Sequence, residues 1–373
     1  MEIIKVNLGA RSYPIYTGAG ILQNLGGYMR DLPVGKNVLV ITNPTVRHLY
    51  CRIVEESLAE AGYCVTVGEI GDGEEFKTLN TAKSLYDLAF DSGIDRSSPV
   101  IALGGGVVGD TAGFVAATYL RGVPFIQVPT TLLAQVDSSV GGKVAVNHPR
   151  GKNIIGVFYQ PRLVLADVSL LKTLPPRELR SGLAEVIKYG VIWSEEFFTW
   201  LEGKTGLLLA CETDALTRVV RESCRIKANV VEEDETEGGL RAILNYGHTF
   251  GHAVEALTGY KKYTHGEAVG IGLVVAARLA ESLGFLAAAD CTRIESLVSR
   301  AGLPREIPEN LTPKDIVGCF YHDKKTVGGR LTFILPGRIG KVDIIRDLEE
   351  HLILDLLRKT RGQLEEDKGM GQF

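Results

Sequence analysis

The stretch Pro99-Val-Ile-Ala-Leu-Gly104-Gly-Gly-Val-Val-Gly109-Asp110 joins a continuous apolar run to a glycine-rich turn. Such a run is typical of a strand that is buried on both faces of a parallel sheet. The glycines fit the spacing Gly-x-Gly-x-x-Gly, which lets the backbone approach a pyrophosphate at the N-terminus of the next helix. The motif departs from the usual dinucleotide fingerprint: it follows a later strand, and Val128-Pro129-Thr130 stand where an acidic residue is expected, about twenty positions on.

Strands and helices alternate along the chain around this stretch. Besides two short strands within residues 2–20, apolar runs predict strands at 36–42, 64–70, 99–103 and 125–128. Helical spacing of apolar residues predicts helices at 46–61 and 78–90. This alternation is typical of βαβ units with right-handed crossovers. We therefore expect residues 1–175 to form a Rossmann-like α/β domain around a parallel sheet.

The sequence changes character after Leu174, where Pro175-Pro176 breaks the chain. From there to residue 320 the apolar residues recur with a helical period, and Gly and Pro stand at the junctions. A late strand pair is predicted at 331–335 and 341–345. Residues 176–373 are therefore expected to form a second, helical domain that carries this strand pair.

Composition narrows the class of protein. The chain has 373 residues, 45% of them hydrophobic, and a net charge of −4, so nucleic acid is not the expected partner. Six scattered cysteines without a Cys-x-x-Cys pair argue against a disulfide framework and a thiolate zinc site. We expect neither a signal peptide nor a membrane span, because no basic region precedes an apolar run and no apolar stretch is long enough. The expected location is cytoplasmic.

Three of the seven histidines lie between Asn245 and Glu267. His248 and His252 are four residues apart, so on a helix they share one face and both reach one point in space. With His265 close by, this pattern indicates a divalent metal site. The alternative is a pair of histidines on a helix surface, because a lone His-x-x-x-His is weak evidence.

A second candidate ligand stands in Gly182-Leu-Ala-Glu185-Val-Ile-Lys188-Tyr189-Gly190. Glu185 and Lys188 are three residues apart and share a helix face, which also fits an exposed ion pair. The neighbouring residues are apolar, however, so the helix is expected to be mostly buried, and a buried carboxylate needs a partner such as a metal ion. Glu185 with two of the three histidines would make a three-ligand site with an open position, the form typical of catalytic zinc.

Two further segments follow predicted strands of the first domain. Asp72-Gly-Glu-Glu-Phe-Lys77 comes after a strand end, on the side of a parallel sheet where ligands bind. It fits either a nucleotide contact or a solvated turn with acids at a helix N-terminus. Thr130-Thr131 follows the next strand, where the hydroxyls could either bind a cofactor or cap the following helix.

Basic residues gather later in the chain. Asp137-Ser-Ser-Val-Gly-Gly-Lys143 and Lys152-Asn153 place glycines beside lysines, a combination that fits either an anion site or a surface loop. Lys227 and Arg241 flank the acidic run 232–237, which we interpret as a solvated loop. Arg241 lies four residues before Asn245, so both side chains are expected to point toward the histidines. Asp323-Lys324-Lys325 is a further basic candidate, with a solvated turn as its alternative.

Taken together, these segments resemble the 3-dehydroquinate synthase family over residues 10–345. The resemblance rests on motifs that occur in the family's order: Asp72-Gly-Glu-Glu-Phe-Lys77, Gly104-Gly-Gly-Val-Val-Gly-Asp110, Gln127-Val-Pro-Thr-Thr-Leu-Leu-Ala-Gln-Val-Asp-Ser-Ser-Val-Gly-Gly-Lys143, Gly182-Leu-Ala-Glu-Val-Ile-Lys-Tyr-Gly190, Asn245-Tyr-Gly-His-Thr-Phe-Gly-His252 and His265-Gly-Glu-Ala-Val.

The resemblance implies a role for each motif. It implies that residues 1–175 bind NAD+ and that residues 176–373 bind metal and substrate, with Glu185, His248 and His265 as ligands of Zn2+ or Co2+. The implied NAD+ residues are Asp72, Gly73, Glu74, Glu75, Phe76, Lys77, Gly106, Val107, Val108, Gly109, Asp110, Thr130, Thr131, Lys143 and Lys152. The implied substrate residues are Asp137, Lys143, Asn153, Lys188, Lys227, Arg241, Asn245, His252 and Lys324, with Arg121 entering from the partner subunit of a homodimer.

The activity implied by the resemblance belongs to the shikimate pathway of aromatic amino acid biosynthesis. The family converts 3-deoxy-D-arabino-heptulosonate 7-phosphate to 3-dehydroquinate and phosphate through transient oxidation by NAD+, phosphate elimination, reduction and aldol cyclisation. The lysines and the arginine would offset the carboxylate and the phosphate of this substrate. Two alternatives stay open: a related sugar phosphate cyclase, and a metal- and NAD-dependent polyol dehydrogenase.

Overall fold

A computed structural model describes residues 1–320 and 331–359 of the chain. Its internal contacts divide the chain into two compact units. The first comprises Met1–Pro175 and Cys211–Thr236, and the second comprises Pro176–Ala210 and Glu237–Phe373. Helix α8 (Thr213–Glu233) belongs to the first unit because it packs against its first two strands. The sequence indicated a single boundary after residue 174 and gave no sign that the chain goes back to the first unit at Cys211–Thr236.

The first unit is built on a seven-stranded sheet in the order β1-β2-β9-β6-β5-β3-β4. Pairing is parallel between all neighbours except β1 and β2, which are antiparallel, so the parallel sheet expected from the sequence carries an antiparallel edge strand. The strands are β1 (Glu2–Val6), β2 (Tyr13–Gly18), β3 (Asn37–Thr42), β4 (Cys64–Glu69), β5 (Val100–Gly104), β6 (Phe125–Pro129) and β9 (Leu163–Asp167).

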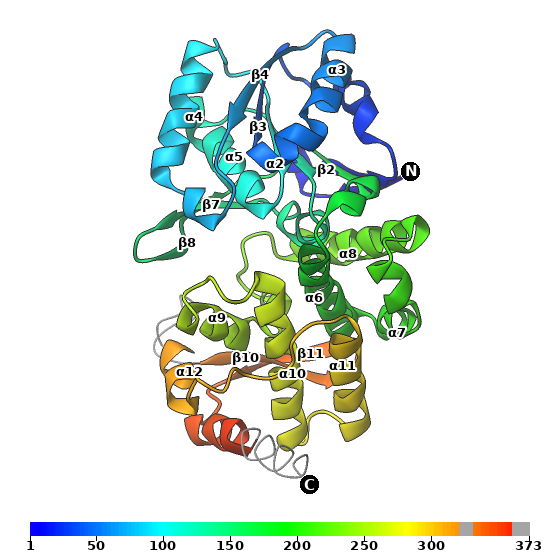
Figure 1. Cartoon of the computed structure of the whole chain (residues 1–373), viewed down its shortest axis with the longest axis vertical. Helices are drawn as coiled ribbons and strands as arrows, with labels where there is room; N and C mark the ends of the chain where they lie inside the picture. The colour runs from blue at the N-terminus through cyan, green and yellow to red at the C-terminus, as the bar shows by residue number, and fades with distance from the viewer. Residues whose placement is uncertain (321–330, 360–373) are drawn as a thin grey trace. The chain divides into compact units, whose positions relative to one another are not determined.

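Both faces of this sheet are buried. Successive side chains of β3 alternate between two hydrophobic clusters: Val38 and Val40 contribute to one, and Leu39 and Ile41 to the other. Helices α1 (Leu25–Met29) and α3 (Arg52–Glu60) supply the first cluster, and α4 (Leu79–Asp91) and α5 (Gly106–Thr118) supply the second (Figure 1). Burial on both faces explains why the strand reads as an uninterrupted apolar run.

Several short elements complete the first unit. A two-stranded antiparallel hairpin, β7 (Lys143–His148) with β8 (Gly151–Phe158), forms a separate sheet that the sequence did not predict, and β7 packs against α5. The remaining short segments are α2 (Pro44–Val46), η1 (Gly9–Arg11), η2 (Leu22–Asn24), η3 (Arg47–Cys51), η4 (Glu74–Phe76), η5 (Tyr119–Arg121), η6 (Ala134–Ser138) and η7 (Val168–Thr173).

The second unit is mainly helical and carries the predicted late strand pair. Its strands β10 (Thr332–Arg338) and β11 (Lys341–Arg346) are antiparallel, and β10 packs beside α10 (Figure 1). Across residues 1–320 and 331–359, no helix combines the length and the apolar character needed to span a bilayer. The described helical segments of this unit are α6 (Pro176–Trp193), α7 (Glu195–Leu209), η8 (Leu240–Asn245), α9 (His248–Leu257), α10 (His265–Ser282), α11 (Ala288–Arg300) and α12 (Pro313–Phe320).

Candidate functional site

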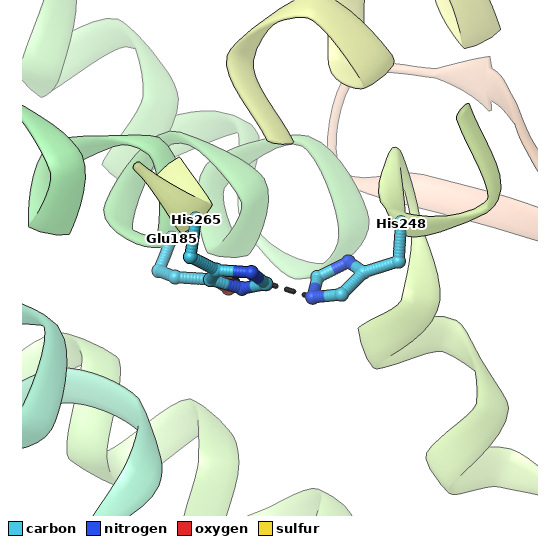
Figure 2. Close-up of side chains that lie close together, drawn as sticks. All are labelled: Glu185, His248 and His265. Carbon is cyan, nitrogen blue, oxygen red and sulfur yellow. Dashed lines mark ion pairs between the residues drawn. The ribbon is translucent and has the colours of Figure 1, made fainter. Parts of the chain in front are cut away.

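Glu185, His248 and His265 converge in the second unit, although they come from three helices. Glu185 lies within α6, whereas His248 and His265 are the first residues of α9 and α10. Figure 2 shows the three side chains pointing toward one another. The Nε2 atoms of both imidazoles lie 3.3 Å from the same oxygen of Glu185, Oε1. The ammonium group of Lys188 pairs with the other oxygen, Oε2. We call Glu185, His248 and His265 the three-helix cluster.

Close backbone contacts bring these helices together. A Cβ on Gly266 would lie 1.9 Å from the carbonyl oxygen of Ser181 in α6, and a Cβ on Gly272 would lie 1.9 Å from that of Gly247. Only glycine permits such approaches, so α10 packs directly against α6 and against the start of α9. A capping box formed by Thr264 and Glu267 then fixes the start of α10 at His265.

Burial and charge decide the state of the Glu185 carboxyl group. The residue is fully buried, and burial alone would raise its pKa, but the Lys188 ammonium and His248 outweigh burial and hold that pKa well below the ordinary value. For His265, burial lowers the pKa, and the neighbouring carboxylates of Glu185 and Glu255 raise it to about 10. Without a cation, the cluster therefore combines an anionic carboxylate with a protonated imidazole.

The cluster fits a divalent cation. Ligand atoms of the three residues lie within 4.8 Å of one another. Within the described residues, neither carboxylate oxygen of Glu185 meets a donor with regular hydrogen-bond geometry, despite the nitrogen atoms within ion-pair range. One carboxylate oxygen and two imidazole nitrogens are the ligand types of open zinc sites. The sequence left open which histidines belong together, and the distances favour His248 with His265 around Glu185.

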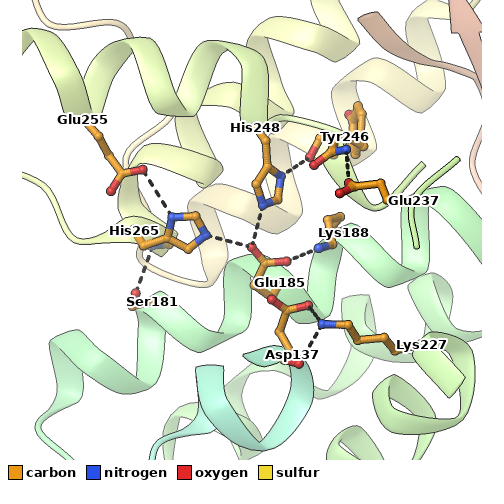
Figure 3. Close-up of polar contacts among 12 residues, drawn as sticks. Asp137, Ser181, Glu185, Lys188, Lys227, Glu237, Tyr246, His248, Glu255 and His265 are labelled. Carbon is orange, nitrogen blue, oxygen red and sulfur yellow. Dashed lines mark hydrogen bonds and ion pairs between the residues drawn. The ribbon is translucent and has the colours of Figure 1, made fainter. Parts of the chain in front are cut away.

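His252 lies beside this cluster. Its ring centroid is 5.5 Å from that of His248 and 6.3 Å from that of His265. A second group of possible ligand atoms consists of His252, Glu255 and His265. Glu255 was not selected from the sequence, yet its Oε2 lies 3.3 Å from Nδ1 of His265 (Figure 3). Its position three residues after His252, on the same helix face, was the signal that could have found it.

Three of the predicted substrate residues also belong to the second unit. Lys188 and Arg241 are almost completely buried, each with 1% of its surface exposed. Asn245 donates a hydrogen bond of 2.9 Å from Nδ2 to Oε1 of Glu237. Glu237 is half-buried and has a left-handed φ of 64°, so the acidic run is not purely a solvated loop, contrary to our interpretation. Its pattern of consecutive acids gave no signal for this contact.

In the first unit, the glycine turn connects β5 to α5 at the carboxyl edge of the sheet. The N–H of Thr130 donates a hydrogen bond of 3.0 Å to the carbonyl oxygen of Gly104. A Cβ on Gly104 would lie 2.6 Å from Val108, so the turn needs glycine there. The α5 N-terminus begins at Gly106, and the first N–H groups of a helix have no partner within it. Gly106, Val107 and Val108 therefore form a backbone surface suited to an anion.

The predicted nucleotide segment 72–77 contacts this turn through a buried ion pair. Nζ of Lys77 lies 2.5 Å from Oδ2 of Asp110 and 2.6 Å from Oδ1 of Asn153. Burial raises the pKa of Asp110, and the Lys77 ammonium lowers it. Glu74 accepts a hydrogen bond from Asn147, and the exposed Asp72 accepts hydrogen bonds from Asn43 and Thr45, so both are anchored. Gly73, Glu75 and Phe76 are exposed. The structure thus joins Asn153, a predicted substrate residue, to two predicted NAD+ residues.

The other candidates of the first unit are more dispersed. Nζ of Lys227 lies 2.7 Å from both the carbonyl oxygen and Oδ1 of Asp137 (Figure 3). Thr131 caps the helical segment that includes η6, accepting a hydrogen bond of 3.1 Å from the N–H of Ala134, as its alternative role required. Lys143 is exposed at the start of β7, and Lys152 is half-buried in β8.

Arg121 lies apart from these groups, and Lys324, within 321–330, is not among the described residues. Arg121 is exposed and follows the C-terminal end of α5, so the helix separates it from Gly106 by roughly 20 Å at 1.5 Å per residue. The expectation that it acts in a partner subunit stays a prediction.

Family models and individual relatives both match this chain, and they name the same family. The model of the 3-dehydroquinate synthase N-terminal region matches residues 67–181, and the C-terminal model matches residues 182–326. A 3-dehydroquinate synthase of Pelotomaculum thermopropionicum is 65% identical over 99% of this chain and 100% of its own length. One from Desulforamulus reducens is 60% identical over 96% of this chain and 99% of its own length.

Solved structures extend the likeness to other cyclases. A 2-deoxy-scyllo-inosose synthase complexed with carbaglucose-6-phosphate, NAD+ and Co2+ is 28% identical, with a TM-score of 0.87 over 96% of this chain and 99% of its own. A 2-epi-5-epi-valiolone synthase from Streptomyces hygroscopicus with NAD+ and Zn2+ bound is 28% identical, with a TM-score of 0.86 over 94% and 97%. On the family models and the relatives of high identity, this chain belongs to the 3-dehydroquinate synthase family.

Proposed function

We propose that this protein catalyses the 3-dehydroquinate synthase reaction. It converts 3-deoxy-D-arabino-heptulosonate 7-phosphate to 3-dehydroquinate and phosphate, as a phosphate-eliminating carbon–oxygen lyase. The observation that carries the proposal is the 65% identity, over 99% of the chain, to a relative of that name. The cation-binding geometry of the three-helix cluster supports it, since the reaction begins by oxidising a hydroxyl group.

Two bound groups belong to this proposal, NAD+ and a divalent cation. NAD+ would lie against the backbone of Gly106, Val107 and Val108, with Lys77 and Asp110 beside it, and the cation would be held by the three-helix cluster. NAD+ supplies a hydride acceptor and donor, and the cation supplies polarisation that lowers the pKa of a substrate hydroxyl. The neighbouring cyclases that carry NAD+ with Co2+ or Zn2+ support this pair of groups.

The remaining residues bind and orient the substrate. Lys188 and Arg241 place two buried positive charges in the second unit, where they would offset an anionic end of the substrate. Lys143, Lys152, Lys227 and Asn153 would do the same from the first unit. His252 can hold or move a proton beside the cluster, and Asn245 can orient a hydroxyl or a water molecule.

Two related activities are the alternatives that an experiment must distinguish from the proposed one. The inosose and valiolone synthases have the same architecture, but their substrates lack the carboxylate that Arg241 would bind with Asn245 and His252. A polyol dehydrogenase is the other alternative, and a probable glycerol dehydrogenase from Sinorhizobium meliloti shares the fold at a TM-score of 0.60 and 17% identity. Such an enzyme would release NADH. We further propose a cytoplasmic homodimer, with Arg121 reaching the site of the partner.

The direct experiment measures phosphate release from the heptulosonate phosphate, with and without NAD+ and a chelator. We expect release only when both NAD+ and the cation are present, without accumulation of NADH, because the hydride returns within each cycle. Net formation of NADH from a simple polyol would instead support the dehydrogenase. Phosphate release that persists after complete removal of the metal would contradict the role of the three-helix cluster.

A further inference from the structure

Glu255 is a buried carboxylate that the proposed reaction does not use. It lies in α9, seven residues after His248 and therefore on the same helix face, and only 5% of its surface is exposed. Its Oε2 lies 3.3 Å from Nδ1 of His265, while Nε2 of the same ring lies 3.3 Å from Glu185 (Figure 3). Each nitrogen of this imidazole thus faces a different carboxylate.

His248 shows the same arrangement with a neutral partner. Its Nδ1 lies 3.1 Å from the carbonyl oxygen of Tyr246, and its Nε2 points to Glu185. A carbonyl oxygen accepts hydrogen bonds and donates none, so Nδ1 of His248 carries the proton, and Nε2 is left for a cation. Tyr246 is itself fixed, because its buried hydroxyl donates to the carbonyl oxygen of Leu273.

We propose that Glu255 is a positioning residue that accepts a hydrogen bond from Nδ1–H of His265 and thereby directs Nε2 of that ring toward the cation. The inference rests on the proposed role of the three-helix cluster. A carboxylate behind a ligating imidazole fixes the tautomer and the ring plane and raises the basicity of the ligand. Because α9 carries both His248 and Glu255, this one helix provides a ligand and orients the ligand of α10.

Two other roles of Glu255 make different predictions. As a structural residue, it would affect the stability of the fold and leave cation affinity unchanged in the folded protein. As a direct ligand, it would act with His252 and His265, the second group of possible ligand atoms. Glu255→Gln separates these roles, because an amide oxygen still accepts a hydrogen bond from Nδ1–H but is a poor substitute for an anionic ligand.

The experiment titrates the metal-free, full-length protein with Zn2+ and with Co2+, and records affinity and the cobalt absorption spectrum. We expect Glu255→Ala to weaken binding by about 10- to 100-fold, the usual effect of losing such a partner. Glu255→Gln should weaken binding less, and Glu295→Gln should leave it unchanged. Glu295 is a matched control because its carboxylate also pairs within the second unit, but with Arg278.

Three results would overturn the inference. The first is wild-type affinity and an unchanged cobalt spectrum in Glu255→Ala. The second is a loss of affinity in Glu255→Gln as large as in Glu255→Ala, accompanied by a loss in His252→Ala but none in Glu185→Gln, which would make Glu255 a direct ligand. The third is a wild-type protein that binds neither cation, and this would remove the proposed cluster as well. If the first result occurs while His248→Ala loses binding, only the role of Glu255 is refuted and the three-helix cluster stands.

Discussion

The turn after β5 and the three-helix cluster are candidate binding sites that the chain builds in two different ways. The turn lies in one continuous stretch, and the backbone around Gly106 supplies its hydrogen-bond donors. The cluster takes single side chains from α6, α9 and α10, which meet only because Gly266 and Gly272 let the helices touch. A contiguous backbone site is visible as a motif, whereas a dispersed site depends on packing that no local pattern records.

The largest expected effect falls on the dispersed site. His265→Ala should abolish phosphate release and binding of Zn2+ or Co2+, because two ligands are too few to hold the cation. The fold should remain, since His265 is partly exposed at the start of α10. Metal content measures the loss of cation binding, a phosphate assay measures the loss of activity, and circular dichroism checks that the fold remains. Retained metal at full occupancy would show that the cluster is not the binding site.

The next effect concerns the ion pair beneath the contiguous site. Lys77→Met should destabilise the protein by about 3 kcal/mol, the low end for a buried pair, because Lys77 is buried and the Asp110 carboxylate, 17% exposed, loses its partner. Chemical denaturation measures this change, and Lys77→Met with Asp110→Leu should recover most of the loss. Lys83→Met is the control, since Lys83 pairs with Asp87 at the exposed surface of α4. If Lys77→Met and Lys83→Met had the same free energy of unfolding, the charge pair between Lys77 and Asp110 would not contribute to stability.

A smaller effect on stability is expected from replacing glycines in the helices of the second unit, and its sign should differ between two positions. Gly266→Ala should cost about 1–3 kcal/mol or more, because its Cβ would overlap the backbone of α6 and displace His265. Gly203→Ala, in α7, meets open space and should stabilise the helix by roughly 0.5–1 kcal/mol. Thermal unfolding compares them, and metal affinity should fall only for Gly266→Ala. A neutral Gly266→Ala would contradict the close approach of the helices.

The smallest expected effect separates the two roles of Thr131. Thr131→Ala should destabilise the protein by about 1 kcal/mol through loss of the helix cap. Ser194→Ala removes the corresponding cap of α7 in the second unit and serves as the control. If Thr131 also contacts NAD+, its variant alone should bind NAD+ more weakly in a fluorescence titration. Equal NAD+ affinity in both variants would leave only the capping role.

The elements that were predicted from sequence are those with local signals. Apolar runs found β3, β4, β5 and β6, and turn residues around Pro336 located β10 and β11. The hairpin β7–β8 was missed because Gly141-Gly142 and Pro149 resemble a loop and most of β8 is exposed, so it has no buried pattern. β9 was missed although it is fully buried. The return of α8 to the first unit depends on tertiary contacts alone.

The candidate site shows the same limit. The histidine spacing and the apolar helix around Glu185 indicated a metal site, but the choice of His265 came from resemblance. Glu255 was missed although its spacing from His252 was a usable signal, whereas Glu237 was missed because one acid within an acidic run carries no distinguishing pattern. For Thr131 the sequence left a cofactor contact and a helix cap open; the structure shows the capping bond, and the NAD+ contact stays a prediction.

His248 and His265 each occupy the first position of a helix, and this placement shapes the local electric field. The amino end of a helix carries roughly half a positive charge, so two such ends oppose the single negative charge of Glu185. With Lys188 close by, the surroundings would attract an anion rather than repel it. Capture of a doubly anionic sugar should therefore slow as ionic strength rises, since screening weakens long-range steering.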